Sequence, residues 1–171
     1  MIVREPALYD TITRIKVGMA AGQTPGVGAP STWEEAAQQI LNELAWQNGW
    51  HLDHMRTEDI EGYYEIGRWD VLARACLADI LSETEMDTTD LVGFLAGKQN
   101  DYGPRNILMF GFEGLKVRLW DKVARLVNLA DRDTIKNESL VDTKIDIVGY
   151  VVITLMLEFG WFELPLEADL T

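Results

Sequence analysis

Apolar residues recur at intervals of three and four along most of the chain, a spacing that places them on one face of an α-helix. No alternating run of β-branched residues, which would indicate a strand, lies between turn signals. We therefore expect an all-α fold, a single-domain helical bundle. The segments predicted to be helical are EPALYDTITRIKVGMA, WEEAAQQILNELAWQ, RWDVLARACLADILSE, DLVGFLAGKQ, LKVRLWDKVARLVNL and NESLVDTKIDIVGYVVITLML.

Capping residues mark where several of these helices begin. Glutamates follow a serine or threonine by three residues, the capping-box spacing, in the pairs Ser31/Glu34 and Thr32/Glu35. A later helix can be capped by Asp87, Thr88 or Thr89. These signals predict one helix that begins near residue 33 and another near residue 88.

Two other segments are rich in turn formers or polar residues. The stretch AGQTPGVGAPST predicts a surface connector after the first helix. We expect residues 1–30 to hold that helix and connector, and residues 31–171 to form one all-α domain. The polar stretch from Gly49 to Gly67 predicts a loop, and its His51 and His54 are expected on the surface of that loop, because no carboxylate or cysteine cluster in the stretch completes a metal site.

One charged stripe follows the helix predicted at residues 115–129. With about 100° of rotation per residue, its polar side chains fall within about 120° of arc, opposite the apolar ones. A stripe of this kind is usually the solvated face of an amphipathic helix. Its members are Arg118, Asp121, Lys122, Arg125 and Asn128.

The last helix carries an acidic edge on an otherwise apolar surface. Glu138, Asp142 and Asp146 recur at intervals of four and share about 80° of arc. Carboxylates at this spacing repel one another, and burial of an unpaired one is unfavourable. We therefore expect a cation to face them, either a lysine or arginine or a hard divalent ion such as Mg²⁺. A salt-bridge network between two helices would satisfy the same requirement.

The segment KQNDYGPRNI holds a tight turn between charged residues. The turn is predicted at Gly103 and Pro104. A bend there can direct the flanking side chains into one cavity, while the alternative is a simple helix end with a local backbone contact. The flanking residues are Lys98, Asp101, Tyr102, Arg105 and Asn106.

Charge is distributed unevenly along the chain. The formal net charge is −13, yet residues 98–136 hold 8 basic and 5 acidic side chains, against 6 and 16 in residues 1–97. The overall sign argues against direct sequence-specific binding of nucleic acid, which usually needs a basic surface. A locally positive site in an acidic protein instead suits a small, multiply charged anion such as a nucleoside phosphate.

Length and composition limit the remaining alternatives. A chain of 171 residues with 47% hydrophobic content suits one domain with a sizeable core. The most apolar stretch, Ile145 to Leu157, is shorter than the roughly 20 residues that span a bilayer. The first residues lack the pattern of a secretion signal, and the single cysteine, Cys76, is expected to be a buried, inert side chain. We expect a cytoplasmic protein without a membrane partner, in the host cell if a phage encodes it.

The three motifs KQNDYGPRNI, RLWDKVARLVNL and ESLVDTKIDIVGY occur in an order that resembles the nucleotide-modification-associated domain 1 family, common in bacteriophages. The resemblance covers about residues 91–155, within a family-like core of about residues 91–160. A more distant similarity is to the all-α MazG-like nucleoside triphosphate pyrophosphatases, which share a PRNL-like turn followed by acidic helices. The chain departs from that pattern where the first acidic helix would lie, because Arg118, Lys122 and Arg125 stand there.

These resemblances imply a site and a reaction. Carboxylates of Asp121, Glu138, Asp142 and Asp146 would hold Mg²⁺, the last three of them at the catalytic centre. The phosphates and base would be bound by Lys98, Asp101, Tyr102, Arg105, Asn106, Arg118, Lys122 and Arg125. The implied activity is hydrolysis of a (deoxy)nucleoside triphosphate to monophosphate and pyrophosphate, in a homodimer or larger oligomer. The alternatives are a non-catalytic sensor of a nucleotide or modified base, and an acidic protein that binds a host factor.

Overall fold

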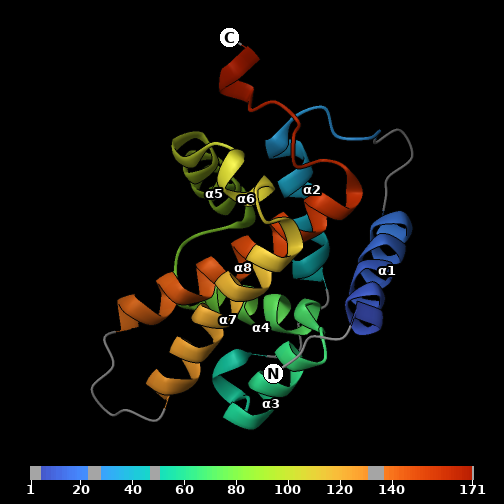
Figure 1. The fold of residues 1–171 in the computed structure, drawn as a ribbon. Coiled ribbons are helices and arrows are strands. Elements are labelled where there is room, and N and C mark those ends of the chain that lie inside the picture. The colour runs from blue at the N-terminus through green and yellow to red at the C-terminus, as the bar shows by residue number, and fades with distance from the viewer. Residues whose placement is uncertain (1–4, 23–27, 47–50, 131–136, 171) are drawn as a thin grey trace.

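The computed structural model describes residues 5–22, 28–46, 51–130 and 137–170. Within these ranges the chain forms eight α-helices and two short 3₁₀ helices, with no strand, which confirms the predicted all-α bundle (Figure 1). The elements in chain order are α1 (Glu5–Gly22), α2 (Trp33–Trp46), η1 (Leu52–His54), α3 (Thr57–Glu65), α4 (Trp69–Glu83), α5 (Thr88–Tyr102), α6 (Arg105–Leu108), α7 (Gly111–Ala130), α8 (Asn137–Phe159) and η2 (Glu167–Leu170).

Two predicted caps form at the helix starts. The Thr32 hydroxyl accepts a hydrogen bond from the backbone N–H of Glu35 at 3.1 Å, while the Glu35 carboxylate accepts from the backbone N–H of Ser31 at 2.7 Å. Asp87 and Asp90 form a complete capping box at the start of α5. Each interaction satisfies backbone N–H groups that have no partner within the first helical turn.

Helix α3 corrects the loop that we predicted from the polar stretch before residue 67. Within α3 only Ile60 and Tyr64 are buried, so its apolar face is too narrow for a clear helical pattern. Tyr64 fixes this face because its ring lies 5.8 Å from that of Trp69 and its hydroxyl donates to the carbonyl of Lys116 at 2.7 Å. Contacts distant in the sequence therefore stabilise a helix that local hydrophobicity does not indicate.

Helix α8 runs through the middle of the bundle, with α7 beside it and α4 behind (Figure 1). The buried face of α8 includes Val148, Val152 and Met156, each without exposed surface. Helix α1 packs against α2 and α4, and its Ile15 belongs to the same core. Cys76 is also buried there, and burial raises the pKa of its thiol, in line with the expected inert side chain.

The chain bends sharply between α5 and α6. Gly103 has a φ of 68°, in the left-handed region that favours glycine, and its N–H donates to the carbonyl of Gln99 at 2.8 Å. Pro104 follows and α6 begins at Arg105. The predicted turn is thus confirmed, and it positions α6 beside the last turn of α5.

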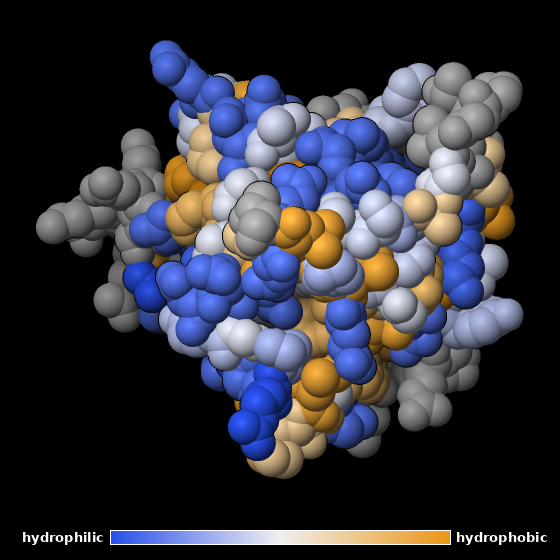
Figure 2. Space-filling model, turned by 90° about the horizontal axis from the view of Figure 1, so that it is seen from above, coloured by the Kyte–Doolittle hydropathy of each residue, from blue (hydrophilic) through white to orange (hydrophobic). Residues whose placement is uncertain are grey.

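The outer surface seen in Figure 2 is mostly hydrophilic, with small apolar patches scattered over it. None of the described helices combines the length and apolar character that a membrane span needs.

Candidate functional site

A cavity of about 280 Å³ lies where α5 and α6 meet the α7–α8 pair. Its wall combines charged, amide and aromatic side chains with an apolar floor. The lining residues are Trp33, Leu95, Lys98, Gln99, Tyr102, Asn106, Ile107, Arg118, Lys122, Asp146, Gly149, Tyr150 and Ile153. Six of the residues that the sequence analysis assigned to the site, namely Lys98, Tyr102, Asn106, Arg118, Lys122 and Asp146, thus line one cavity.

Asp146 is the charged centre of this cavity. The ammonium group of Lys98 lies 2.8 Å from Oδ1 of Asp146, and that of Lys122 lies 3.0 Å from Oδ2. Burial alone would favour the neutral acid, but the hydrogen bonds from the two lysines outweigh it and lower the pKa of Asp146. The carboxylate is therefore ionised at neutral pH, and with Arg118 the cavity carries three cations against one anion.

Helical spacing explains why these side chains meet. Residues three or four apart lie on one face of a helix. Lys98 and Tyr102 project from α5 in this way, Arg118 and Lys122 from α7, and Asp146 is followed by Gly149 and Tyr150 on α8. Three helix faces therefore converge on the same space.

Apolar groups form the other side of the cavity. Leu95 and Ile107 are buried in this wall. Gly149 leaves room for the cavity, because a Cβ atom at this position would lie 3.0 Å from a methyl group of Leu95. Tyr102 is 72% exposed, so it lies where the cavity opens to solvent. A planar ligand could therefore contact apolar surface while its charged part meets the lysines.

Other predicted site residues lie away from this wall. Asp101, Arg105, Asp121, Arg125 and Asp142 are exposed and do not line the cavity. Asp121 lies on the side of α7 that faces α3, because its negative charge acts on Tyr64 of α3. Burial first, and then this charge, raise the pKa of Tyr64 to about 12. The side chain of Glu138 lies outside the described part of the chain. Of the described carboxylates in the predicted metal set, Asp146 alone lines the cavity, and it is already paired with two lysines.

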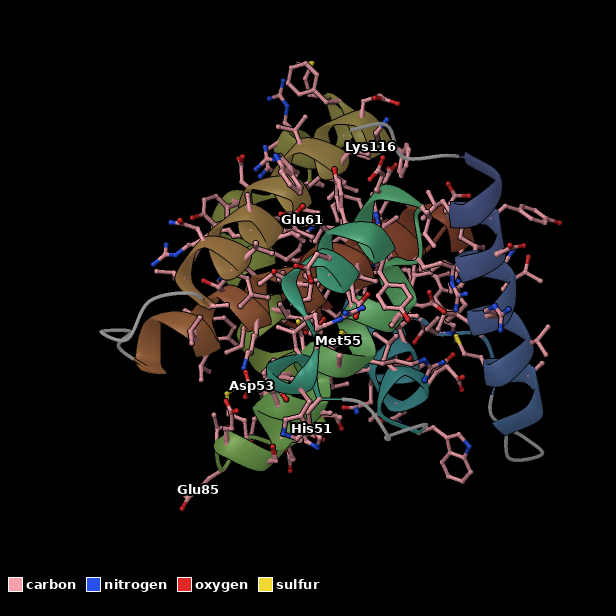
Figure 3. All side chains as sticks on the ribbon, turned by 90° about the horizontal axis from the view of Figure 1, so that it is seen from below. His51, Asp53, Met55, Glu61, Glu85 and Lys116 are labelled. Carbon is pink, nitrogen blue, oxygen red and sulfur yellow. The ribbon has the colours of Figure 1, made fainter. Side chains whose placement is uncertain are left out.

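A second charged cluster surrounds Lys144, which is 1% exposed. Its ammonium group lies 2.8 Å from Asp53, 2.9 Å from Asp79 and 3.6 Å from Glu83. His51 approaches the same place, with Nδ1 at 2.8 Å from Oδ1 of Asp79. Figure 3 shows His51 and Asp53 close together beside α4.

The three carboxylates of this cluster could hold a metal ion, because each offers an oxygen and these oxygens lie within 4.8 Å of one another. Lys144 already provides a cation among them, so an ion would compete with its ammonium group. The hydrogen bond with Asp53 and burial together raise the pKa of Glu83 to about 7. Burial alone would lower the pKa of Lys144. Its hydrogen bonds to Asp53 and Asp79 outweigh this effect, so the pKa is raised.

This cluster was not predicted from the sequence, where His51 and His54 were expected on a loop without a carboxylate cluster to complete a metal site. His54 is exposed within the short helix η1, but His51 contacts a buried aspartate from α4. Asp79 and Lys144 each interrupt an apolar helix face. A buried charge needs a partner of opposite sign. The presence of one acidic and one basic residue on two buried helix faces is the sequence signal that could have predicted the pairing of Asp79 with Lys144.

Comparison of the chain with protein-family models, with curated proteins and with solved structures gave no match. A functional assignment therefore rests on the geometry and chemistry of the cavity.

Proposed function

We propose that the cavity around Asp146 binds a nucleoside triphosphate. The observation that carries this proposal is the convergence of Lys98 and Lys122, from different helices, on one carboxylate beside an apolar wall. A polyphosphate needs several cations close together, and a nucleobase needs a flat, water-excluding surface. This cavity offers both within one space.

The two lysines can bind a phosphate and keep their ion pairs with Asp146. An ammonium group has three N–H donors, and the contact with Asp146 uses one of them on each lysine. The other donors can turn towards phosphate oxygens, with the Lys98 ammonium group also 4.8 Å from the centre of the Phe94 ring. Arg118 can add a bidentate contact. Both ammonium groups would then contact Asp146 and the anion at the same time.

The apolar part of the cavity suits the nucleoside. Tyr102 at the mouth and Tyr150 in the wall provide aromatic faces for a base. The volume of about 280 Å³ is close to the lower end of the range of about 300–1,000 Å³ found for small-molecule sites. A nucleotide can therefore bind with its base inside and part of its phosphate chain towards solvent.

Mg²⁺ enters this proposal as the ion that a nucleoside triphosphate carries on its own phosphate oxygens. Among the described residues that line the cavity, Asp146 is the one carboxylate, and its two lysine partners oppose a close approach of a second cation. These residues do not fit a protein-bound Mg²⁺ site, so the geometry supports nucleotide binding more strongly than metal-assisted hydrolysis.

Titration calorimetry with ATP, GTP, CTP, UTP and dTTP in Mg²⁺, together with an assay for released pyrophosphate, tests this proposal. We expect at least one of these nucleotides to bind, and Lys122→Met to weaken that binding. Lys116→Met is the matched control, because Lys116 lies on the same helix, pairs with Glu113 and does not line the cavity. Absence of binding by all five nucleotides would contradict the proposal.

The pyrophosphate assay separates an enzyme from a sensor. Turnover that Asp146→Asn abolishes would add hydrolysis to the binding function. Tight binding without turnover identifies a protein that senses or sequesters the nucleotide.

A further inference from the structure

Two buried polar atoms in the described part of the chain have no hydrogen-bond partner: Nε1 of Trp33 and Oδ1 of Asn106. Both residues line the cavity around Asp146. Buried polar atoms in folded proteins are nearly always paired, so each exception calls for an explanation. Both exceptions belong to residues of one cavity, where a bound ligand can supply the missing partners.

Trp33 is held firmly at the start of α2. Its side chain is almost fully buried, at 1% exposure, and its backbone N–H donates to the carbonyl of Pro165 at 2.9 Å. The indole nitrogen is a donor only, so it requires an acceptor. None of the described protein groups supplies one.

Asn106 reaches the same cavity from α6, just after the bend at Gly103. Its neighbour Ile107 is buried and anchors this short helix to the core. The unpaired atom of Asn106 is an acceptor, so it requires a donor. A ligand that completes both atoms presents an acceptor to Trp33 and a donor to Asn106, while it packs against apolar surface.

We propose that Trp33 and Asn106 recognise the polar edge of the nucleobase in the bound nucleotide. This inference rests on the proposed nucleotide function and names the residues that read the base. Each standard nucleobase carries an acceptor beside an N–H donor on its pairing edge, on a flat ring with apolar faces. An inorganic polyphosphate has no such edge. Trp33 also gives the N-terminal half of the chain a role in the site.

The test compares ligands with and without a base. Calorimetry measures binding of the tightest of ATP, GTP, CTP, UTP and dTTP, and of inorganic tripolyphosphate, to Trp33→Phe, Asn106→Leu and Lys98→Met. We expect the first two variants to bind the nucleotide about threefold to tenfold more weakly, the effect of one lost neutral hydrogen bond. Their affinity for tripolyphosphate should stay within about twofold of wild type, whereas Lys98→Met should weaken both ligands.

Thermal unfolding without ligand controls for folding. Trp33→Phe removes a donor that has no partner, but it also leaves a gap in the core because Trp33 is almost fully buried. We therefore expect its melting temperature to fall by a few degrees, and calorimetry is run at a temperature where every variant is folded. If nucleotide affinity is unchanged in Trp33→Phe and Asn106→Leu, base recognition by this pair is wrong while the nucleotide site stands. 5-Phosphoribosyl pyrophosphate, which has the sugar and phosphates but no base, is measured in the same way. If Trp33→Phe and Asn106→Leu weaken its binding as much as that of the nucleotide, the pair reads the sugar and the base assignment is wrong. Failure of every nucleotide to bind overturns the proposed function itself, whether or not tripolyphosphate binds.

Discussion

The ammonium group of Lys122 lies 3.0 Å from Oδ2 of Asp146, and this contact joins the basic stripe of α7 to the acidic edge of α8. The same carboxylate also forms an ion pair with Lys98 of α5. Three helices are therefore connected at one charged group, beside a cavity with an apolar wall. A purely structural salt bridge would satisfy the charges, but it would not account for the buried polar atoms of Trp33 and Asn106, two lining residues, that have no partner in the described part of the chain.

Substitution of the lysines tests the cationic side of the cavity. Lys98→Met and Lys122→Met should each weaken binding of tripolyphosphate by about tenfold or more, because a hydrogen bond to a charged group contributes about 1.5–3 kcal/mol. Lys116→Met should leave the affinity unchanged. Calorimetry in metal-free buffer gives the comparison, and equal losses in all three variants would indicate a general charge effect instead of a site.

Asp146→Asn should have the opposite effect on anion binding. Removal of the negative charge between the two lysines should tighten tripolyphosphate binding by about threefold to tenfold. The reason is that two like charges roughly 6 Å apart near a protein surface repel each other by an energy on the order of 1 kcal/mol. Calorimetry in the presence of a chelator measures this. Weaker binding would mean that Asp146 mainly holds the lysines in position.

Gly149→Ala tests the space inside the cavity. The new methyl group would lie 3.0 Å from a Leu95 methyl group, so Leu95 must shift and the cavity must narrow. We expect weaker nucleotide binding in a folded protein. Gly93→Ala is the control because a Cβ there meets nothing within 4 Å, and it should raise stability by about 0.5–1 kcal/mol. Unchanged nucleotide affinity in Gly149→Ala would place the ligand elsewhere.

Lys144→Met should destabilise the fold by about 3–5 kcal/mol, because it leaves the fully buried Asp79 without its lysine partner. Urea unfolding measures the loss, with Lys116→Met as the control. The three carboxylates of the cluster would then be open to a divalent ion, so added Mg²⁺ should raise the melting temperature of Lys144→Met more than that of wild type. Equal stability of Lys144→Met and wild type would contradict the described ion pairs.

Glu83 should make stability depend on pH. Its pKa is raised from 4.5 to about 7 by the hydrogen bond with Asp53 and by burial. Between these two values the folded state holds a proton that the unfolded state has released, so this contribution is complete below pH 4.5 and is lost as the pH rises through about 7.

Urea unfolding at about pH 5 and about pH 8 measures this change. Glu83→Gln should show a smaller fall in stability with rising pH than wild type. Glu85→Gln is the control because Glu85 points away from the cluster in Figure 3. Identical pH dependence in wild type and Glu83→Gln would show that the proton is held elsewhere.

Helical periodicity and capping residues were enough to predict most of the bundle. The spacing of Asp87 and Asp90 fixes the start of α5 locally, and the four-residue intervals of α7 and α8 put Lys122 and Asp146 on faces that meet. Helix α3 was missed because the burial of Tyr64 depends on α4 and α7. Hydrophobic periodicity predicts a helix only where that helix has a wide apolar face.

The rest of the site depends on contacts between distant segments. Trp33 precedes Asn106 by more than seventy residues, and no local spacing connects them. Lys144 likewise meets partners from η1 and α4. The exposed Asp142 and Asp121 had suitable spacing on their helices, but the rotation of each helix in the bundle turns them away from the cavity. Tertiary packing decides such orientations.

The most direct measurement is an NMR titration of the isotopically labelled protein with inorganic tripolyphosphate. Our account predicts that resonances of Lys98, Lys122 and Asp146 shift together and saturate, while those around Lys144 stay in place. Shifts confined to the Lys144 cluster, or spread evenly over the surface lysines, would contradict an anion site at Asp146.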